Sequence, residues 1–148
     1  MASWKEFKEI QPELAEFGFK KLTSQVAYLG TVQRDDFPRI HPVAPIISPE
    51  NLFVFMEPTS PKGKDLNRNH KYFLHSLVTD SNGTGGEFWI KGLGYKVNDS
   101  NLRNEATVSS SYKPEDRYIL FQLFIEQVGS TVYNDGIPSY KRWKAPNL

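Results

Sequence analysis

The sequence predicts a mainly β fold, a small antiparallel barrel with short helices, in a single domain covering residues 1–148. The length suits one domain. Short segments rich in β-branched and aromatic residues recur along the chain, and four-residue polar turns separate the first three. Turns of that length join antiparallel strands, because parallel strands need a long crossover. At 39% hydrophobic and 14% aromatic residues, the chain can pack a core and is not expected to be disordered.

A helical segment is predicted at the N-terminus, over residues 3–18. Ser3 and Glu6 form a capping box. Apolar residues then recur at three- and four-residue steps, at Phe7, Ile10, Leu14 and Phe17. Pro12 divides the segment into two short helices, and Gly18 is expected near the end of the second.

Six strands are expected after this segment, at residues 26–32, 39–47, 52–56, 72–78, 87–97 and 118–128. The first three are expected to form a meander. Residues 130–133 are a candidate seventh strand that folds back across Gly129. Connecting helices are expected near 60–69 and 99–110. Gly92 and Gly94, two residues apart within one strand, indicate a bulge or a close backbone approach.

The composition excludes several functional classes. Without cysteine the chain has no disulfide, thiolate metal site or cysteine nucleophile. Its formal net charge of +1 gives no overall field for nucleic acid. No apolar run is long enough to cross a bilayer, and the charged N-terminus does not resemble a signal peptide. We therefore expect a cytoplasmic protein with no membrane or nucleic-acid partner. The three histidines form no metal-binding pattern, so no metal site is expected.

The segment from Ser60 to Leu66 is the first candidate for chemistry. Ser60 is a good N-cap, and Pro61 suits the first helical position. Lys62 and Lys64 then lie at the end of the helix that already carries a partial positive charge. Two interpretations remain open. Either the two lysines lie on a solvated surface that tolerates their repulsion from the positive helix end, or a bound anion such as phosphate neutralises the positive charge there.

The segment around Arg39 is the second candidate. Alternation places Arg39, His41 and Val43 on one face of a strand and Ile40 on the other. Prolines donate no ladder hydrogen bond, so Pro42 and Pro45 cannot both belong to a regular central strand. The segment is either an ordinary edge strand with solvent-exposed side chains or a strand whose edge without a hydrogen-bonded neighbour faces a ligand.

Near the end of the chain, Trp143 is flanked by Lys141, Arg142 and Lys144. A large indole among three cations is expected to pack on the domain, on a partner or on a cofactor.

Taken in order, several segments resemble those of the pyridoxamine 5′-phosphate oxidase-related, FMN-binding split-barrel proteins. They are residues 28–32, 38–43, 52–55, 60–66 and 86–92, with Arg142 and Trp143 extending the match. The resemblance covers nearly the whole chain from about residue 20. It implies a six-stranded Greek-key split barrel that forms a homodimer, with FMN at the interface between the two subunits.

The resemblance also implies roles for particular residues. Arg39, Ile40, His41, Pro42 and Val43 match the strand that lines the flavin and reaches its phosphate, and Phe55 and Met56 match the next flavin-lining strand. Ser60 and Lys62 match the phosphate-binding turn, where Lys64 is a further cation. Glu87 matches a polar residue that reaches the flavin from the partner chain. Trp143 is expected close to the flavin or the dimer seam, with simple packing on the barrel as the alternative.

Three departures from the family pattern bear on the activity. Pro61 replaces a basic residue, Glu87 is acidic where the oxidase has an amide, and the segment that holds pyridoxal phosphate is not recognisable. The expected function is therefore an FMN-dependent oxidoreductase acting on a small molecule other than vitamin B6, with no catalytic residue identified. The alternatives are a non-catalytic flavin-binding or redox-sensing module, or the same barrel holding F420 or haem. For haem, His41 or His75 would be the axial ligand.

Overall fold

The computed structural model describes residues 1–147, and the last position of the predicted domain, residue 148, lies outside the described residues. The described chain forms four helices and eight strands. In chain order they are α1 (Trp4–Ile10), α2 (Pro12–Thr23), β1 (Ala27–Val32), β2 (Pro38–Val43), β3 (Ile46–Ile47), β4 (Leu52–Met56), α3 (Pro61–Arg68), β5 (Lys71–Ser76), β6 (Glu87–Val97), α4 (Ser100–Ser109), β7 (Ile119–Asn134) and β8 (Ile137–Lys144).

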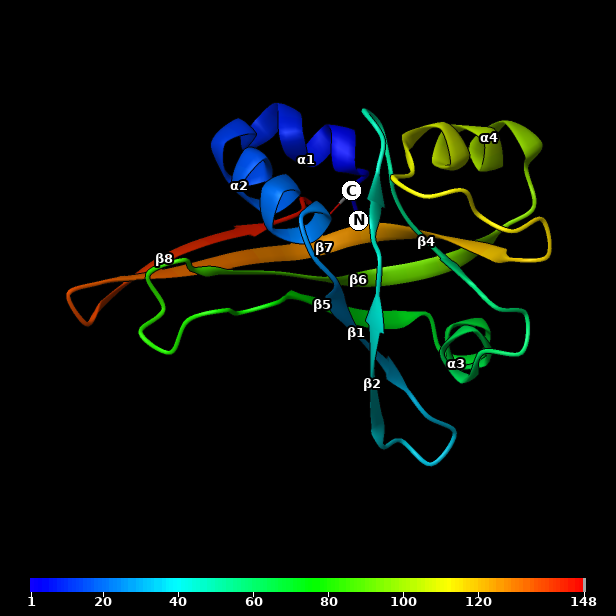
Figure 1. Cartoon of the computed structure of the whole chain (residues 1–148), viewed down its shortest axis with the longest axis horizontal. Coiled ribbons are helices and arrows are strands. Elements are labelled where there is room, and N and C mark those ends of the chain that lie inside the picture. Colours follow the sequence, from blue (N-terminus) through cyan, green and yellow to red (C-terminus); the bar gives the residue numbers. More distant parts are fainter. Residues whose placement is uncertain (148) are drawn as a thin grey trace.

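All the strands belong to one antiparallel sheet in the order β2-β1-β5-β6-β7-β4-β3, with β8 added beside β7. The sheet has eight strands rather than the six predicted, and it is not closed. Its two end strands, β2 and β3, are consecutive in the chain and separated only by Ala44 and Pro45. The sheet must therefore curl strongly, and Figure 1 shows β1 and β2 crossing the long β6 and β7 at a steep angle. This architecture is consistent with a split barrel.

The expected strand at 39–47 is two strands, so the consecutive pairings of the predicted meander form, but not through one continuous middle strand. β2 pairs only with β1, whereas β3 pairs with β4 at the other end of the sheet. Pro45 lies in the break between them. Because proline has no N–H to donate to a ladder, the chain leaves one strand pair there and joins another.

The C-terminal hairpin also differs from the prediction. β7 continues through Gly129, because the Trp89 ring packs where a side chain at residue 129 would lie. Residues 130–133 therefore extend β7 and do not fold back on it. The chain turns instead at Asp135 and Gly136, which both have positive φ. This is the two-residue turn that Asp-Gly favours, and β8 then pairs with β7 along its full length.

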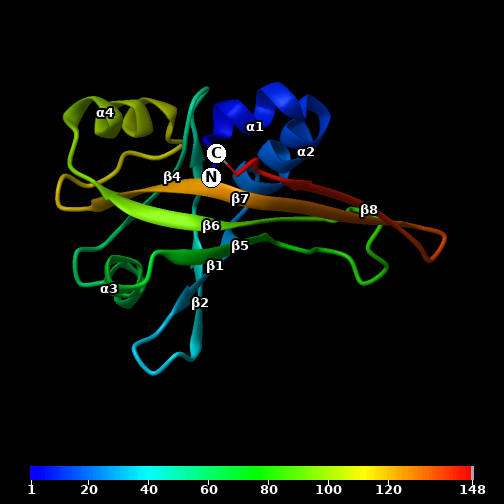
Figure 2. The same cartoon turned by 180° about the vertical axis from the view of Figure 1, so that it is seen from behind.

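The N-terminal helices form as predicted, with the Ser3–Glu6 capping box in place. The second helix runs to Thr23, five residues beyond the predicted end. Gly18 does not end it, because the glycine allows the Phe88 ring to pack directly against the helix backbone. α1, α2 and α4 lie on one side of the β6–β7 pair and α3 on the other, beside β1 (Figures 1 and 2).

The core lies between α1–α2 and the curled sheet, with Trp4, Phe7, Phe88 and Phe121 among its largest fully buried side chains. A smaller cluster around Phe53 and Phe55 lies beneath α4. The predicted irregularity in β6 is confirmed by a shift in strand register between Lys91 and Gly92. Within residues 1–147, no helix combines the length and apolar character needed to cross a membrane.

Candidate functional site

The open part of the sheet lies between β2 and β4. β3 pairs Ile46 with Phe53, and the same register, if continued, would set Val43 opposite Met56 and Arg39 opposite Ser60. The β3–β4 ladder stops at Ile46, so β2 and the end of β4 separate. Each keeps one main-chain edge without a strand partner, because β2 pairs only with β1 and residues 54–56 pair only with β7. The segments that the sequence singled out flank this split.

Ser60 and Lys62 lie at the end of the split, where α3 begins. Both are buried, with 8% and 9% of their surfaces exposed. Lys62 Nζ donates to Ser60 Oγ at 2.9 Å, and within residues 1–147 no carboxylate lies within 4 Å of that ammonium. Burial lowers the pKa of Lys62 below its ordinary value. Among the described residues, the start of α3 therefore holds a buried cation whose only side-chain partner is a neutral hydroxyl.

Close packing against β4 fixes the position of this helix start. A side chain at Gly63 would come within 2.9 Å of Met56 Sδ and 3.2 Å of Ile119 Cδ1, so the first turn of α3 lies directly on the core. The side chains of Phe55 and Met56 are buried in the two core clusters. These two residues can therefore offer mainly main-chain atoms to a ligand in the split.

Arg39 is held by Asp65 and not by Ser60 or Lys62. Arg39 Nε and Thr31 Oγ1 each donate to Asp65 Oδ2 at 2.8 Å, and Arg68 Nη2 donates to Oδ1 at 3.0 Å. Burial acts to raise the pKa of Asp65, but the hydrogen bonds from Arg39, Thr31 and Arg68 outweigh it and leave the pKa below 3.8. The sequence reasoning did not identify Thr31, Asp65 and Arg68 as a cluster. Asp65 and Thr31 are 34 residues apart, so no spacing rule could have linked them.

Lys64 points to a different place from Lys62, because residues two apart on a helix face nearly opposite ways. It is exposed and lines a cavity of about 550 Å³ between α3 and the β1–β2 turn. Four cationic side chains and two carboxylates line this cavity: Arg34, Arg39, Lys64, Arg68, Asp35 and Asp65. Lys62 and Lys64 therefore do not share one pocket.

The outer side of the sheet at β2, β1 and β5 carries an exposed apolar face. Tyr28, Ile40 and Phe73 surround a cavity of about 440 Å³ there, and Ile40 is 71% exposed. We call these three residues, with Pro38, the apolar face. Trp89 extends it, with its ring 5.2 Å from that of Phe73. The predicted alternation holds, because Ile40 lies on this side while Arg39 turns toward Asp65.

The remaining candidates have varied surroundings. His41 and Pro42 are exposed on β2, and Val43 is buried in the core. Glu87 pairs with His75, with 3.3 Å between Glu87 Oε2 and His75 Nε2. Trp143 lies in β8 and packs into the core, its ring 5.2 Å from that of Phe7. That placement favours the packing alternative for Trp143 over contact with a cofactor.

Comparisons with known proteins support the fold. No family model and no curated protein matches the chain. A heme binding protein from Mycobacterium smegmatis shares the fold with a TM-score of 0.67 and 14% identity, over 88% of this chain and 58% of that one. The chain thus spans little more than half of the mycobacterial protein.

Two further solved structures are similar. HutZ, the heme storage protein from Vibrio cholerae, matches with a TM-score of 0.60 and 14% identity, over 80% of this chain and 92% of that one. A Clostridium acetobutylicum protein related to general stress protein 26, of the pyridoxinephosphate oxidase family, matches at 0.61 and 15%, over 95% of each chain. At these identities the similarity shows the split-barrel fold alone.

Proposed function

We propose that this chain binds FMN in the split between β2 and β4 and acts as a flavin-dependent oxidoreductase on a small molecule other than vitamin B6. The proposal rests on the buried ammonium of Lys62, whose only side-chain partner in residues 1–147 is the neutral Ser60 hydroxyl. A buried charge is costly unless an opposite charge pairs with it. A phosphate at the start of α3 would supply that charge and could accept a hydrogen bond from the main-chain N–H of Lys62, because Pro61 has no N–H and those of Gly63 and Lys64 donate to Ser60 O.

The unpaired edges of β2 and β4 complete the proposed cofactor site. Arg39–Val43 and Phe55–Met56 present main-chain N–H and C=O groups along the split, and a flavin ring has donors and acceptors along one edge that such groups can bind. When bound, the flavin accepts and gives hydride at N5. The protein therefore needs to bind, orient and shield the ring, and the proposal requires no acid–base pair.

A homodimer is part of this proposal. The apolar face of Tyr28, Pro38, Ile40 and Phe73 is exposed, and exposed apolar patches mark interfaces. A second copy of the chain would cover it and supply the second wall that a flavin ring needs. Glu87, which pairs with His75 beside this face, would then reach the flavin of the other subunit.

A non-catalytic flavin-binding or redox-sensing module would use the same site. Oxidation of NADH or NADPH by the flavin-loaded protein distinguishes the two functions, because a binding module does not turn over. The deazaflavin alternative is tested in the same way: a protein that takes up F420 but not FMN would be an F420-binding protein.

Haem is the second candidate cofactor, since two of the similar structures are named as heme-binding or heme-storing proteins. Both ring nitrogens of His75 have partners, at Ser76 O and Glu87 Oε2. His41 is exposed on the open edge of β2, and within residues 1–147 only its Nδ1 has a partner, at Pro42 O. His41 is therefore the better axial ligand, and a haem propionate would pair with Lys62.

The absorption spectrum of the purified protein tests these cofactors together. Flavin bands that are released on heating support FMN. A Soret band that disappears in the His41→Ala variant supports haem at the same split. A colourless protein that takes up neither FMN, F420 nor haem overturns the proposal.

A further inference from the structure

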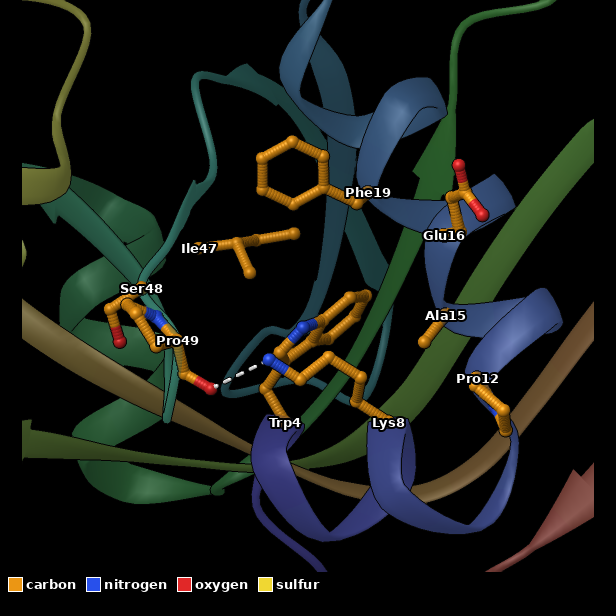
Figure 3. A pocket seen from close by; sticks show the side chains of 9 residues that line it. All are labelled: Trp4, Lys8, Pro12, Ala15, Glu16, Phe19, Ile47, Ser48 and Pro49. Carbon is orange, nitrogen blue, oxygen red and sulfur yellow. Dashed lines mark hydrogen bonds between the residues drawn. The ribbon is translucent and has the colours of Figure 1, made fainter.

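A separate cavity of about 450 Å³ lies between α1, α2 and the β3–β4 turn (Figure 3). None of its lining residues belongs to the candidate cofactor site. Trp4 and Lys8 come from α1, Phe19 from α2, and Ile47 and Pro49 from the opposite wall. Its size is within the range of small-molecule sites.

The interior of this cavity is largely apolar and contains two aromatic rings. Trp4 and Ile47 are 2% and 7% exposed, so the inner wall is part of the rigid core. Phe19 is 45% exposed and stands at the opposite end of the cavity from Trp4, as Figure 3 shows. An apolar, flat molecule could pack between the indole, the phenyl ring and Ile47.

Two donors in the cavity, Lys8 Nζ and the Trp4 indole N–H, have no carboxylate partner in residues 1–147, whereas the Ser48 hydroxyl donates to Glu105 Oε2 at 2.8 Å. In the part of the chain that the structure describes, Lys8 Nζ donates only to the carbonyl oxygen of Pro49, at 3.3 Å. The carboxylate of Glu16 at the rim is already paired with Lys20, at 3.4 Å. No acceptor in residues 1–147 receives the indole N–H of Trp4, and this atom is not sealed from solvent, since the one buried side-chain atom without a partner in these residues is Asp80 Oδ1. A free indole N–H of this kind can donate to a ligand that enters the cavity.

We propose that this cavity binds a small aromatic carboxylate. The ring system packs between Trp4, Phe19 and Ile47, and the carboxylate accepts hydrogen bonds from Lys8 Nζ and the Trp4 indole N–H. Charge selects an acid, because the one lysine in the cavity lacks a carboxylate and the one glutamate has a lysine. The site is independent of the flavin proposal, since it shares no residue with the split.

The test uses two probes that differ only at the polar end, 2-naphthylacetate and the neutral 2-naphthaleneethanol. Both are titrated into ¹⁵N-labelled full-length protein, with and without added FMN, while the three indole N–H signals are followed by NMR. Trp→Phe variants assign the signals to Trp4, Trp89 and Trp143. We expect 2-naphthylacetate to shift the Trp4 signal most and to bind about tenfold more tightly than the alcohol, as a charge-assisted hydrogen bond at a partly exposed lysine allows.

Three variants separate the possible outcomes. Lys8→Ala should reduce the affinity of the acid to that of the alcohol, and Phe19→Ala should weaken both probes. Lys71→Ala, which removes an exposed lysine from β5, should change neither. Equal loss for both probes in Lys8→Ala, or a shift confined to Trp89 or Trp143, would overturn the proposal. Since FMN uptake is measured on the same sample, failure of this site and failure of the flavin site are seen separately.

Discussion

The Lys62 ammonium lies 2.9 Å from Ser60 Oγ, and that hydroxyl is the only side-chain partner of the ammonium within residues 1–147. Both residues are at least nine-tenths buried. A cation held this way lowers stability in the absence of an anion, and strained or costly arrangements of this kind are typical of binding sites. Replacing Lys62 should therefore weaken the binding of a phosphate ligand and, in the ligand-free protein, increase stability.

Removing the Lys62 charge should weaken FMN selectively. Lys62→Ala is expected to raise the Kd for FMN about ten- to a hundredfold, because one charge-assisted hydrogen bond to the phosphate is lost. Riboflavin has the same ring without a phosphate, so its affinity should hardly change. Quenching of flavin fluorescence measures both. Lys64→Ala is the control, since Lys64 lies on the exposed side of the same helix and should have a much smaller effect. Equal weakening of both ligands would show that Lys62 supports the fold instead.

The ligand-free protein should become more stable when Lys62 is replaced by methionine, which keeps the apolar stem. Burial lowers the pKa of Lys62 from its ordinary 10.5, so the charged form opposes folding at neutral pH. That penalty is fully present below the lowered pKa and disappears as the pH rises toward 10.5. The Tm of Lys62→Met should therefore exceed that of the wild type at pH 7, and the difference should shrink at alkaline pH. A lower Tm at pH 7 would contradict a buried, unpaired charge.

Asp65 should be a determinant of stability rather than of ligand binding. It is 3% exposed and accepts hydrogen bonds from Thr31, Arg39 and Arg68. Asp65→Ala leaves two arginines without their carboxylate and should cost about 2–3 kcal/mol in denaturant unfolding, below the full range for a buried pair because the arginines are partly exposed. Asp35→Ala, in the same cavity but exposed, should cost little.

Because its pKa is lowered, Asp65 stabilises the fold above the ordinary value of 3.8 and loses this contribution as the pH falls below it. The wild type should lose stability below about pH 4 more steeply than Asp65→Ala. Parallel pH profiles for the two proteins would contradict this role.

Local signals in the sequence located most of the elements. The capping box, the bulge at Gly92 and the strands at 52–56 and 87–97 are fixed by neighbouring residues, and they formed as predicted. Gly18 and Gly129 were misread as an end and a turn, because their role is to admit the rings of Phe88 and Trp89 from distant strands. The Asp135-Gly136 pair is itself a local turn signal, although the prediction placed the turn at Gly129.

The candidate site was predictable only in part. The N-terminal position of Ser60 and Lys62 follows from local helix rules, and the structure adds that the lysine is buried. Arg39 was expected to act with these residues, but Asp65 holds its guanidinium. Competition between a distant carboxylate and a ligand depends on tertiary contacts, which no spacing in the sequence encodes.

The apolar face should hold two copies of the chain together. Ile40 is 71% exposed beside Tyr28 and Phe73. If this face is the dimer interface, a lysine at position 40 would bury an unpaired charge there and oppose association. Light scattering of the wild type should give twice the 17.0 kDa of one chain, whereas Ile40→Lys should give the monomer mass with an unchanged circular dichroism spectrum. Val108→Lys is the matched control, because Val108 is similarly exposed, at 76%, on the distant helix α4.

FMN should bind more weakly to Ile40→Lys than to Val108→Lys if the second subunit forms one wall of the flavin site. A wild-type monomer that still binds FMN would remove the dimer from the proposal and leave the phosphate site at Lys62 standing on its own.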